Sequence, residues 1–376
     1  MDIYVLNSDL EQLAIIDSFK SLIWTKRYYT CGDFELCMAA DLEKLKFLQP
    51  DNFLIREDDE TVMVIEKIEA HYDSDEGALF IVSGRSLESL LTRRVCSHIV
   101  SINTPDVVSG IKTLIEAETP SHNSSEYRSI PHLVIDDSFT VEERLKTQFT
   151  GDVLLDAVTA ICKTYKIGLK MTISGSDIVL AFYAGQRSAA VFSNEFDNLI
   201  NSRYLFDRET VANFAYVGGQ GEGISRTVVE MAAYTPPATG LNRREIWVDA
   251  RDIDDTDESL YLQLLIQRGR QKLAENQVVQ TFEAEIEPFS SFKYKVDFNL
   301  GDIVTVQNEY GITANPRIVE IVESWDETGY TMIPTFDSLD IPDHVVLKDS
   351  NGKILKDSSG KIVCEGVKLW QNSMSN

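Results

Sequence analysis

Four glycines fall within seven residues in the stretch VGGQGEG, Val217 to Gly223, and runs of this kind hold phosphates in many enzymes. A dinucleotide fingerprint needs a further glycine three positions after Gly221, where this chain has Ile224. A P-loop needs Lys and Ser or Thr directly after its last glycine, but Gly223 is followed by Ile224 and Ser225. The next segment, RTVVEMAAY, alternates like a strand and offers no helix N-terminus to a phosphate. The run therefore predicts a hairpin tip in which glycine supplies positive φ.

The run DARDIDDTDE, from Asp249 to Glu258, holds six carboxylates in ten residues and at first resembles a calcium-binding loop. Counted from Asp252, the sixth position of that loop should be glycine and the twelfth an acid. The chain has Asp257 and Gln263 there. We expect these acids to cap the following helix and to favour its positive N-terminus. A cation bound by residues 249–258 is the alternative.

The other reactive side chains follow no catalytic spacing. The stretch SGRSLES is not a nucleophile elbow, because its serine is followed by Leu-Glu. The histidines form neither an HExxH helix nor a close ligand pair: His71, His98, His122, His132 and His344. No pair of carboxylates is marked out for glycoside hydrolysis by its setting. We predict no catalytic, cofactor-binding or metal-binding residues, no cofactor, and no enzymatic activity.

The charge of the chain limits its partners. The 376 residues carry a net charge of −25, which repels nucleic acid phosphates and argues against sequence-specific DNA binding. An acidic surface that lets DNA pass without adsorbing is compatible with the same charge. The five cysteines are an odd number without a CxxC pair, and Cys37 and Cys162 are expected to be small core residues in a reducing cytoplasm. Neither a signal peptide nor a run of ~18 apolar residues is present, so we expect no membrane segment.

The hydrophobic pattern predicts a β-rich α+β protein. Residues 1–85 contain short strands rich in β-branched and aromatic residues, as expected of a small barrel or sandwich. Residues 86–200 are an inserted α/β unit: Ser86 is expected to cap a helix over 86–95, two more helices are expected over 106–118 and 151–167, and 119–131 is an exposed polar loop. Residues 201–340 return to strands around one helix at 258–276.

The C-terminal residues 341–376 differ from the rest of the chain. LKDSNGKI (347–354) is followed at once by LKDSSGKI (355–362), with a single substitution between the copies. Asn-Gly and Ser-Gly are turn signals, so we expect a hairpin extension that packs on another chain.

Several stretches, in order, resemble the Gp37-like tail proteins of siphophages. They are SLIWTKRYYTCGDFEL (21–36), VSGRSLESLLTRRV (82–95), NFAYVGGQGEGISRTVV (213–229), RREIWVDARDI (243–253), LGDIVTVQNEYGI (300–312) and RIVEIVESWDETGYTMIPTF (317–336). The resemblance covers roughly residues 1 to 340 and leaves out the C-terminal repeat.

The resemblance implies a virion structural protein at the distal end of the tail, similar to the baseplate hubs of contractile phages. Such hubs are homotrimers in which each subunit contributes two tube-like β-barrels, so that three chains form a pseudo-sixfold ring that continues the tail tube. The implied partners are distal tail and tail-tip proteins and the tape measure protein, and DNA would pass through the lumen. Some hub relatives carry a C-terminal peptidoglycan-cleaving domain, and from the roughly 36 residues after the resemblance we expect no such domain here.

Two other classes of function are compatible with the sequence. A carbohydrate-binding tail module would use the polar loop 119–131 and Tyr127 to bind the host cell wall. A cell-wall hydrolase would need a nucleophile or metal set within 86–200. Within the hub hypothesis, Trp24, Tyr28 and Tyr29 are candidate intersubunit contacts, with packing inside the first barrel as the alternative for each.

Overall fold

The computed structural model describes residues 1–73, 77–119, 127–193, 196, 198–253, 258–286, 292–307 and 313–337, with two short strands at 344–346 and 364–366. The segments outside the described residues include the C-terminal repeat at 347–362, and residues 74–76 between two expected strands. No helix in the described part is long and apolar enough to cross a membrane.

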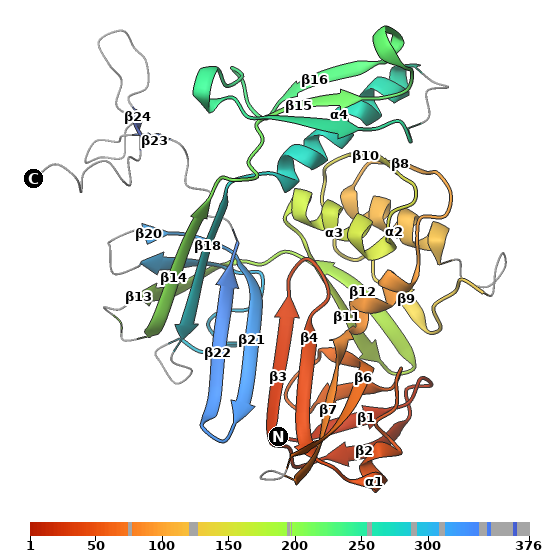
Figure 1. The fold of residues 1–376 in the computed structure, drawn as a ribbon, viewed down its shortest axis with the longest axis vertical. Helices are drawn as coiled ribbons and strands as arrows, with labels where there is room; N and C mark the ends of the chain where they lie inside the picture. Colours follow the sequence, from red (N-terminus) through yellow and green to blue (C-terminus); the bar gives the residue numbers. More distant parts are fainter. Residues whose placement is uncertain are drawn as a thin grey trace, which may run out of the picture.

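One eleven-stranded sheet dominates the protein, in the order β14-β18-β22-β21-β3-β4-β7-β6-β5-β1-β2 (Figure 1). Seven of its strands come from the N-terminal block: β1 (Ile3–Leu6), β2 (Gln12–Ile16), β3 (Ser21–Arg27), β4 (Asp33–Ala39), β5 (Phe53–Arg56), β6 (Val62–Asp73) and β7 (Gly77–Ser86). Four come from the later block: β14 (Leu199–Asp207), β18 (Val279–Ile286), β21 (Ile318–Asp326) and β22 (Gly329–Phe336). The pairing of β21 with β3 joins the two blocks.

The β-rich α+β class is confirmed, whereas the two tube-like barrels are not. Among the described residues, the end strands β14 and β2 do not pair with each other, so the large sheet is open. The sequence did not predict β13 (Arg187–Ser193) and β14. Polar and apolar residues alternate less clearly in these two stretches than in the N-terminal strands. The boundaries at 85, 200 and 340 stay a prediction.

The α/β unit covers one side of the N-terminal strands (Figure 1). It contains a 3-10 helix η1 (Leu87–Arg93), the helices α2 (Val107–Glu118) and α3 (Leu154–Tyr165), and the strands β8 (Val100–Thr104), β9 (Leu133–Ile135), β10 (Leu145–Phe149), β11 (Gly168–Ser174) and β12 (Asp177–Tyr183). The helix predicted at 86–95 is thus shorter and more tightly wound. Ser86 makes no capping bond, because its hydroxyl instead accepts from the Gly32 N–H at 2.7 Å and donates to Glu88.

Two small sheets complete the later block. β13 lies beside β19 (Ile303–Gln307), which pairs with β20 (Thr313–Ala314). At the upper end in Figure 1, α4 (Glu258–Glu275) packs under a sheet of β16 (Val228–Ala232), β15 (Phe214–Gly218) and β17 (Glu245–Asp249). A short helix α1 (Leu42–Leu45) and two 3-10 turns, η3 (Gly223–Ser225) and η4 (Gly240–Asn242), lie in connections.

The largest core cluster lies between the N-terminal sheet and the α/β unit, and it includes Val64, Leu91, Ile111 and Val158. Cys162 is buried there, as predicted. Cys37 is only half-buried, because it lies on the opposite face of β4 from Leu36. Cys31, Cys37, Cys96 and Cys162 are free thiols.

A bulge in β6 explains one glycine. Gly84 of β7 lies opposite Ile65, where the β6 register shifts. A Cβ at Gly84 would lie 1.9 Å from the Val64 carbonyl oxygen, so this position has no room for a side chain.

We therefore expect Gly84→Ala to lower the free energy of unfolding by about 1–3 kcal/mol, as overpacking in cores does. Urea unfolding followed by circular dichroism measures it. The neighbouring, half-buried Ser83→Ala is the control, with a change within about 0.5 kcal/mol. Equal stability of the two variants would contradict the steric argument.

Candidate functional site

The junction between the two β-rich blocks is the most elaborate site of the described protein. β3 and β21 run antiparallel with Thr25 opposite Val322, so strands almost 300 residues apart share one ladder. At its end, the Arg27 Nε lies 2.6 Å from a Glu320 carboxylate oxygen. The junction is thus formed by backbone hydrogen bonds with a charged pair at one end.

Buried ions lie on one face of this ladder. Lys26 Nζ lies 2.6 Å from Asp59 and 2.7 Å from Glu323, and all three side chains are at most 7% exposed. Arg56, fully buried, reaches Glu323 at 3.1 Å and Asp58 at 2.6 Å. Burial alone would raise the pKa of Asp59, but the charge of Lys26 outweighs it and holds the pKa well below its usual range. The lowered pKa keeps Asp59 in its charged form beside Lys26.

Aromatic rings enclose the ions. The Arg56 guanidinium lies 5.6 Å from the Trp24 ring centroid and 4.2 Å from that of Trp325, which comes from the other block. Trp24 and Tyr28 are fully buried within the chain, and Tyr29, 7% exposed, donates to Asp337 at 3.0 Å. The proposed intersubunit role of these aromatics is therefore wrong, because each packs inside its own chain.

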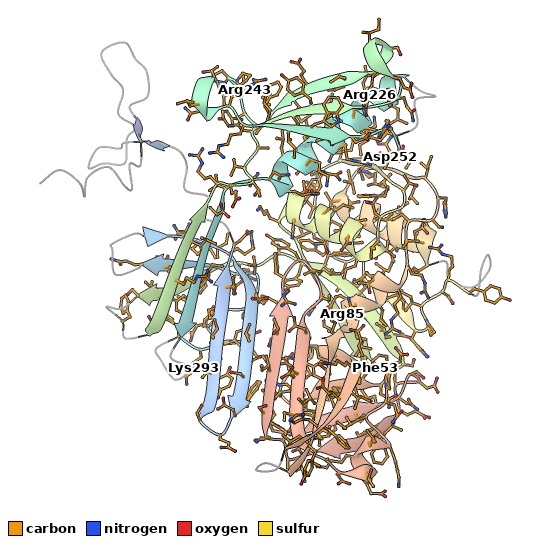
Figure 2. All side chains as sticks on the ribbon, viewed as in Figure 1. Phe53, Arg85, Arg226, Arg243, Asp252 and Lys293 are labelled. Carbon is orange, nitrogen blue, oxygen red and sulfur yellow. The ribbon has the colours of Figure 1, made fainter. Side chains whose placement is uncertain are left out.

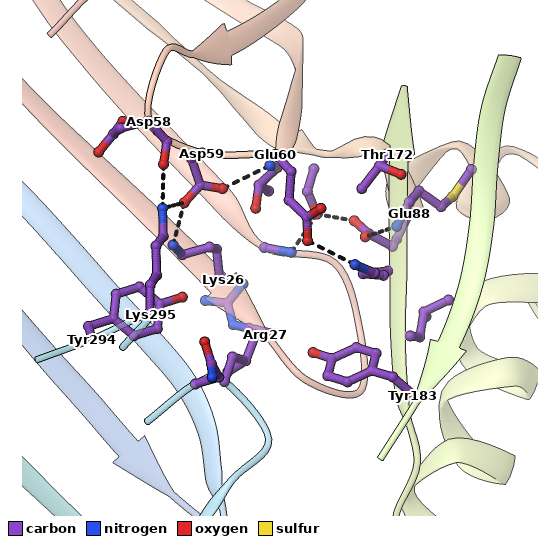
Figure 3. Close-up of a pocket in the computed structure, with 18 residues that line it drawn as sticks. Lys26, Arg27, Asp58, Asp59, Glu60, Glu88, Thr172, Tyr183, Tyr294 and Lys295 are labelled. Atoms are coloured by element: carbon purple, nitrogen blue, oxygen red, sulfur yellow. Dashed lines mark hydrogen bonds and ion pairs between the residues drawn. The ribbon is translucent and has the colours of Figure 1, made fainter. Parts of the chain in front are cut away.

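A hollow of about 440 Å³ opens beside the junction, between β3, the β5–β6 connection and β11 (Figure 3). Apart from Glu88, its charged side chains are paired: besides the Lys26 ions, Lys170 lies 2.8 Å from Glu60 and Lys295 lies 2.9 Å from Asp59. The hollow thus joins the N-terminal block, the α/β unit and the later block through ion pairs, and its lining suits structural cohesion better than acid–base catalysis.

Glu88 differs from the other acids of this hollow. It is buried in η1 and accepts from the Met171 N–H at 2.7 Å and from the Ser86 hydroxyl, neither of which is a cation. Burial raises the pKa of Glu88, although these hydrogen bonds oppose the shift. The carboxyl group connects η1 to β11 and favours its protonated form.

The glycine run lies where the sequence predicted, at the tip of the β15–β16 hairpin. The Gly219 N–H donates to the Thr227 carbonyl at 2.8 Å, and Gly221 and Gly223 have φ of +95° and +55°. Arg226 lies at this tip (Figure 2) and donates to Asp249 at 2.9 Å.

The other candidate residues are not brought together. Asp249 pairs with Arg251, and Asp252 pairs with Arg268 at 2.8 Å, while 254–257 lie outside the described residues. Among the described residues, no group of three or more potential metal ligands is found. Of the polar loop 119–131, only Thr119 and 127–131 are described, and Tyr127 is 95% exposed. His71 lies in β6, whereas His98 and His132 lie in two different connections, and His122 is not described.

Sequence reasoning missed Lys26, Asp59 and Glu323. Lys26 lies within an apolar strand and Glu323 within another, and a charge at a position that alternation places in the core is a signal of a buried pair. The signal names no partner, because the pairing depends on strands far apart in sequence.

Glu323→Gln should lower the free energy of unfolding by roughly 3–5 kcal/mol, because Lys26 and Arg56 then remain buried without their shared counter-charge. Glu327→Gln, on the same hairpin but exposed, should change it by less than about 0.5 kcal/mol. Chemical denaturation of both variants measures the difference. A loss no larger than that of the control would show that the buried network contributes little.

Glu88→Gln should change how stability depends on pH. A carboxyl group whose pKa is raised by folding contributes stability below its unfolded pKa, and this contribution is lost as pH rises through the folded value. As pH rises from about 4, the usual pKa of a free glutamate, the melting temperature of the natural protein should therefore fall relative to that of the variant. The exposed Glu57→Gln should follow the natural protein. Parallel curves for Glu88→Gln would contradict the burial argument.

Comparison with known proteins assigns the chain to a protein family. The family described as Siphovirus ReqiPepy6 Gp37-like protein matches residues 2–336. No curated protein matches the chain. Among solved structures, the 43 kDa tail protein of prophage MuSo2 from Shewanella oneidensis is similar in fold, with 13% sequence identity, a TM-score of 0.57, and 89% of this chain and 98% of that chain covered.

Two other tail proteins share the fold. The tail protein from Neisseria meningitidis MC58 has 13% identity and a TM-score of 0.55, with 90% of this chain and 96% of that chain covered. The prophage tail protein gp18 from Listeria monocytogenes EGD-e has 12% identity and a TM-score of 0.54, with coverage of 90% and 94%. The family match over residues 2–336 confirms what the sequence stretches indicated: the chain belongs to the Siphovirus ReqiPepy6 Gp37-like protein family.

Proposed function

We propose that this protein is a structural component of the phage virion tail, a distal hub that continues the tail tube and links it to tail-tip or receptor-binding proteins. The family match over residues 2–336 is the observation that carries the proposal. The fold shared with three proteins whose names describe them as tail proteins supports it, because the likeness covers about nine-tenths of this chain in each case.

The working form of the hub is a homotrimeric ring. The two β-rich blocks, proposed as residues 1–85 and 201–340, would each supply one segment of the ring, so that three chains form six segments. The continuous sheet across β21 and β3 supports this arrangement, because it holds the two segments of one chain side by side. The α/β unit at 86–200 and the C-terminal extension at 341–376 would lie outside the ring wall.

The charge suits a channel for DNA. A net charge of −25 repels phosphates, and a lumen that makes no cationic contacts releases no counterions and does not retain DNA. The distal tail proteins and the tape measure protein are the partners such a ring would need. The absence of enzymatic activity stays a prediction.

Static light scattering of the purified protein over a range of concentrations tests the ring. We expect a species of three times 42.4 kDa, with ring-shaped projections in negative stain. A monomer at every concentration that also binds purified host cell walls would contradict the hub and favour the carbohydrate-binding module, for which the exposed Tyr127 is the first residue to replace.

A further inference from the structure

The large sheet contains the same four-stranded unit twice. Its order can be divided into β14-β18-β22-β21 followed by β3-β4-β7-β6, and then β5, β1 and β2. In both units, the first strand pairs with the second, the second with the third, and a hairpin joins the third to the fourth, all antiparallel. We call them the later unit and the N-terminal unit.

The two units agree residue by residue. The hairpins close at Asp326 opposite Gly329 and at Asp73 opposite Gly77. The bulges, at Val319 and Glu66, both lie seven residues before the closing aspartate.

The second strands agree as well. Both carry Phe-Glu, with Glu283 opposite Thr335 in one and Glu35 opposite Ser83 in the other, and these are equivalent positions on the third strands. In the first strands, Tyr204 opposite Phe282 corresponds to Trp24 opposite Phe34. The units are therefore equivalent in register as well as in order.

Within the chain, the fourth strand of the later unit pairs with the first strand of the N-terminal unit. Residues 320–325 of β21, after the bulge, carry this junction with β3. The equivalent stretch of β6 is 67–72. Throughout the described chain it pairs only with β7, because β5 takes only Val62, Met63 and Val64. β14, the equivalent of β3, pairs only with β18 there.

We propose that β6 of one copy pairs with β14 of the next copy, in the register that β21 and β3 use within the chain. The equivalences place Lys67 opposite Asp207, Glu69 opposite Leu205 and His71 opposite Arg203. This inference rests on the proposed ring and names its intersubunit contact, so that one kind of strand junction recurs six times around three chains.

One pair of residues at the predicted contact carries complementary charges. In the intrachain junction, Arg27 on the first strand bonds Glu320 on the fourth at 2.6 Å. At the equivalent positions of the intersubunit junction, the first strand carries Asp207 and the fourth carries Lys67. The two charges are swapped between the strands relative to Arg27 and Glu320, but they still attract each other. Lys67 and Asp207 are accessible, since Lys67 is exposed and Asp207 is half-buried.

The surface beside β6 has a hollow that is lined by residues equivalent to those at the junction of β21 and β3. In the intrachain junction, a hollow is lined by Glu323, Trp325, Tyr330 and Met332 of the later unit, by residues 293–295, and by Asp58 of the β5–β6 connection. The equivalent residues of the N-terminal unit are Ala70, Tyr72, Ala78 and Phe80, and they line an apolar hollow of about 390 Å³. Tyr72 is 76% exposed there, whereas Arg56 covers its equivalent, Trp325. By analogy with the pairing of β21 and β3 within the chain, we expect β14 of a second copy to cover this hollow.

Cysteine cross-linking tests the contact. Glu69→Cys and Leu205→Cys place thiols at directly opposite positions of neighbouring copies, and both natural side chains are exposed, so each variant should fold. Under oxidising conditions, the double variant should give covalent species of two and three chains in a denaturing gel. A mixture of the two single variants should give covalent dimers of one chain of each kind. Glu69→Cys with Asp207→Cys, two residues out of register, is the matched control and should cross-link far less, because diagonal neighbours lie about 7–8 Å apart.

The outcomes separate the contact from the ring. Cross-links in the matched pair and not in the shifted pair support the inference. A trimer by light scattering that shows no preference for the matched pair would overturn the contact and leave the hub in place. A protein that is monomeric and gives no cross-link at any concentration would contradict both. A charge swap provides a second readout. Lys67→Glu should weaken assembly, and the double variant Lys67→Glu with Asp207→Lys should restore it. A folded double variant that does not assemble would count against this register.

Discussion

The fold depends on the burial of Lys26, Arg56, Asp59 and Glu323 where two distant strands meet. Removing four ions from water costs several kcal/mol each, and only close pairing offsets that cost. The four side chains come from β3, β5, the β5–β6 connection and β21, so the charges are neutralised only when both β-rich blocks are in place. A misaligned β21 would leave Lys26 and Arg56 buried without Glu323. The network therefore reinforces the register that the buried apolar residues of both strands, such as Trp24 and Ile321, already favour.

That register makes the sheet continuous and positions the rest of the chain. Across the hollow beside the junction, Lys170 of β11 pairs with Glu60 of the β5–β6 connection, and Glu88 of η1 holds β11 within the α/β unit. The β15–β17 sheet and α4 lie at the far end, attached through α3 and β10 (Figure 1). Two equivalent units joined in one sheet suit the proposed role as a segment of a tube wall.

The sequence predicted the local elements more completely than their assembly. Strands such as 62–73 and 317–325, the helix at 258–276 and the glycine hairpin tip follow from alternation, periodicity and turn chemistry, which are local properties. The pairing of β3 with β21 does not, because nothing near Lys26 in the chain identifies Glu323 as its partner. The repeated unit left faint traces, such as Phe-Glu at 34–35 and 282–283, but its equivalence lies in strand register, which only the paired sheet reveals. The same limit explains why Trp24 was a candidate for an intersubunit contact: a large aromatic residue in a strand has the same pattern whether it faces its own core or another chain.

The most direct test of the account is a cryo-electron microscopy map of the assembled protein at a resolution that separates β-strands. We expect a threefold ring with six four-stranded units in its wall, three of the junctions formed by β21 with β3 and three by β6 with β14. A ring in which β6 and β14 face solvent, or in which subunits meet through the α/β unit, would contradict it.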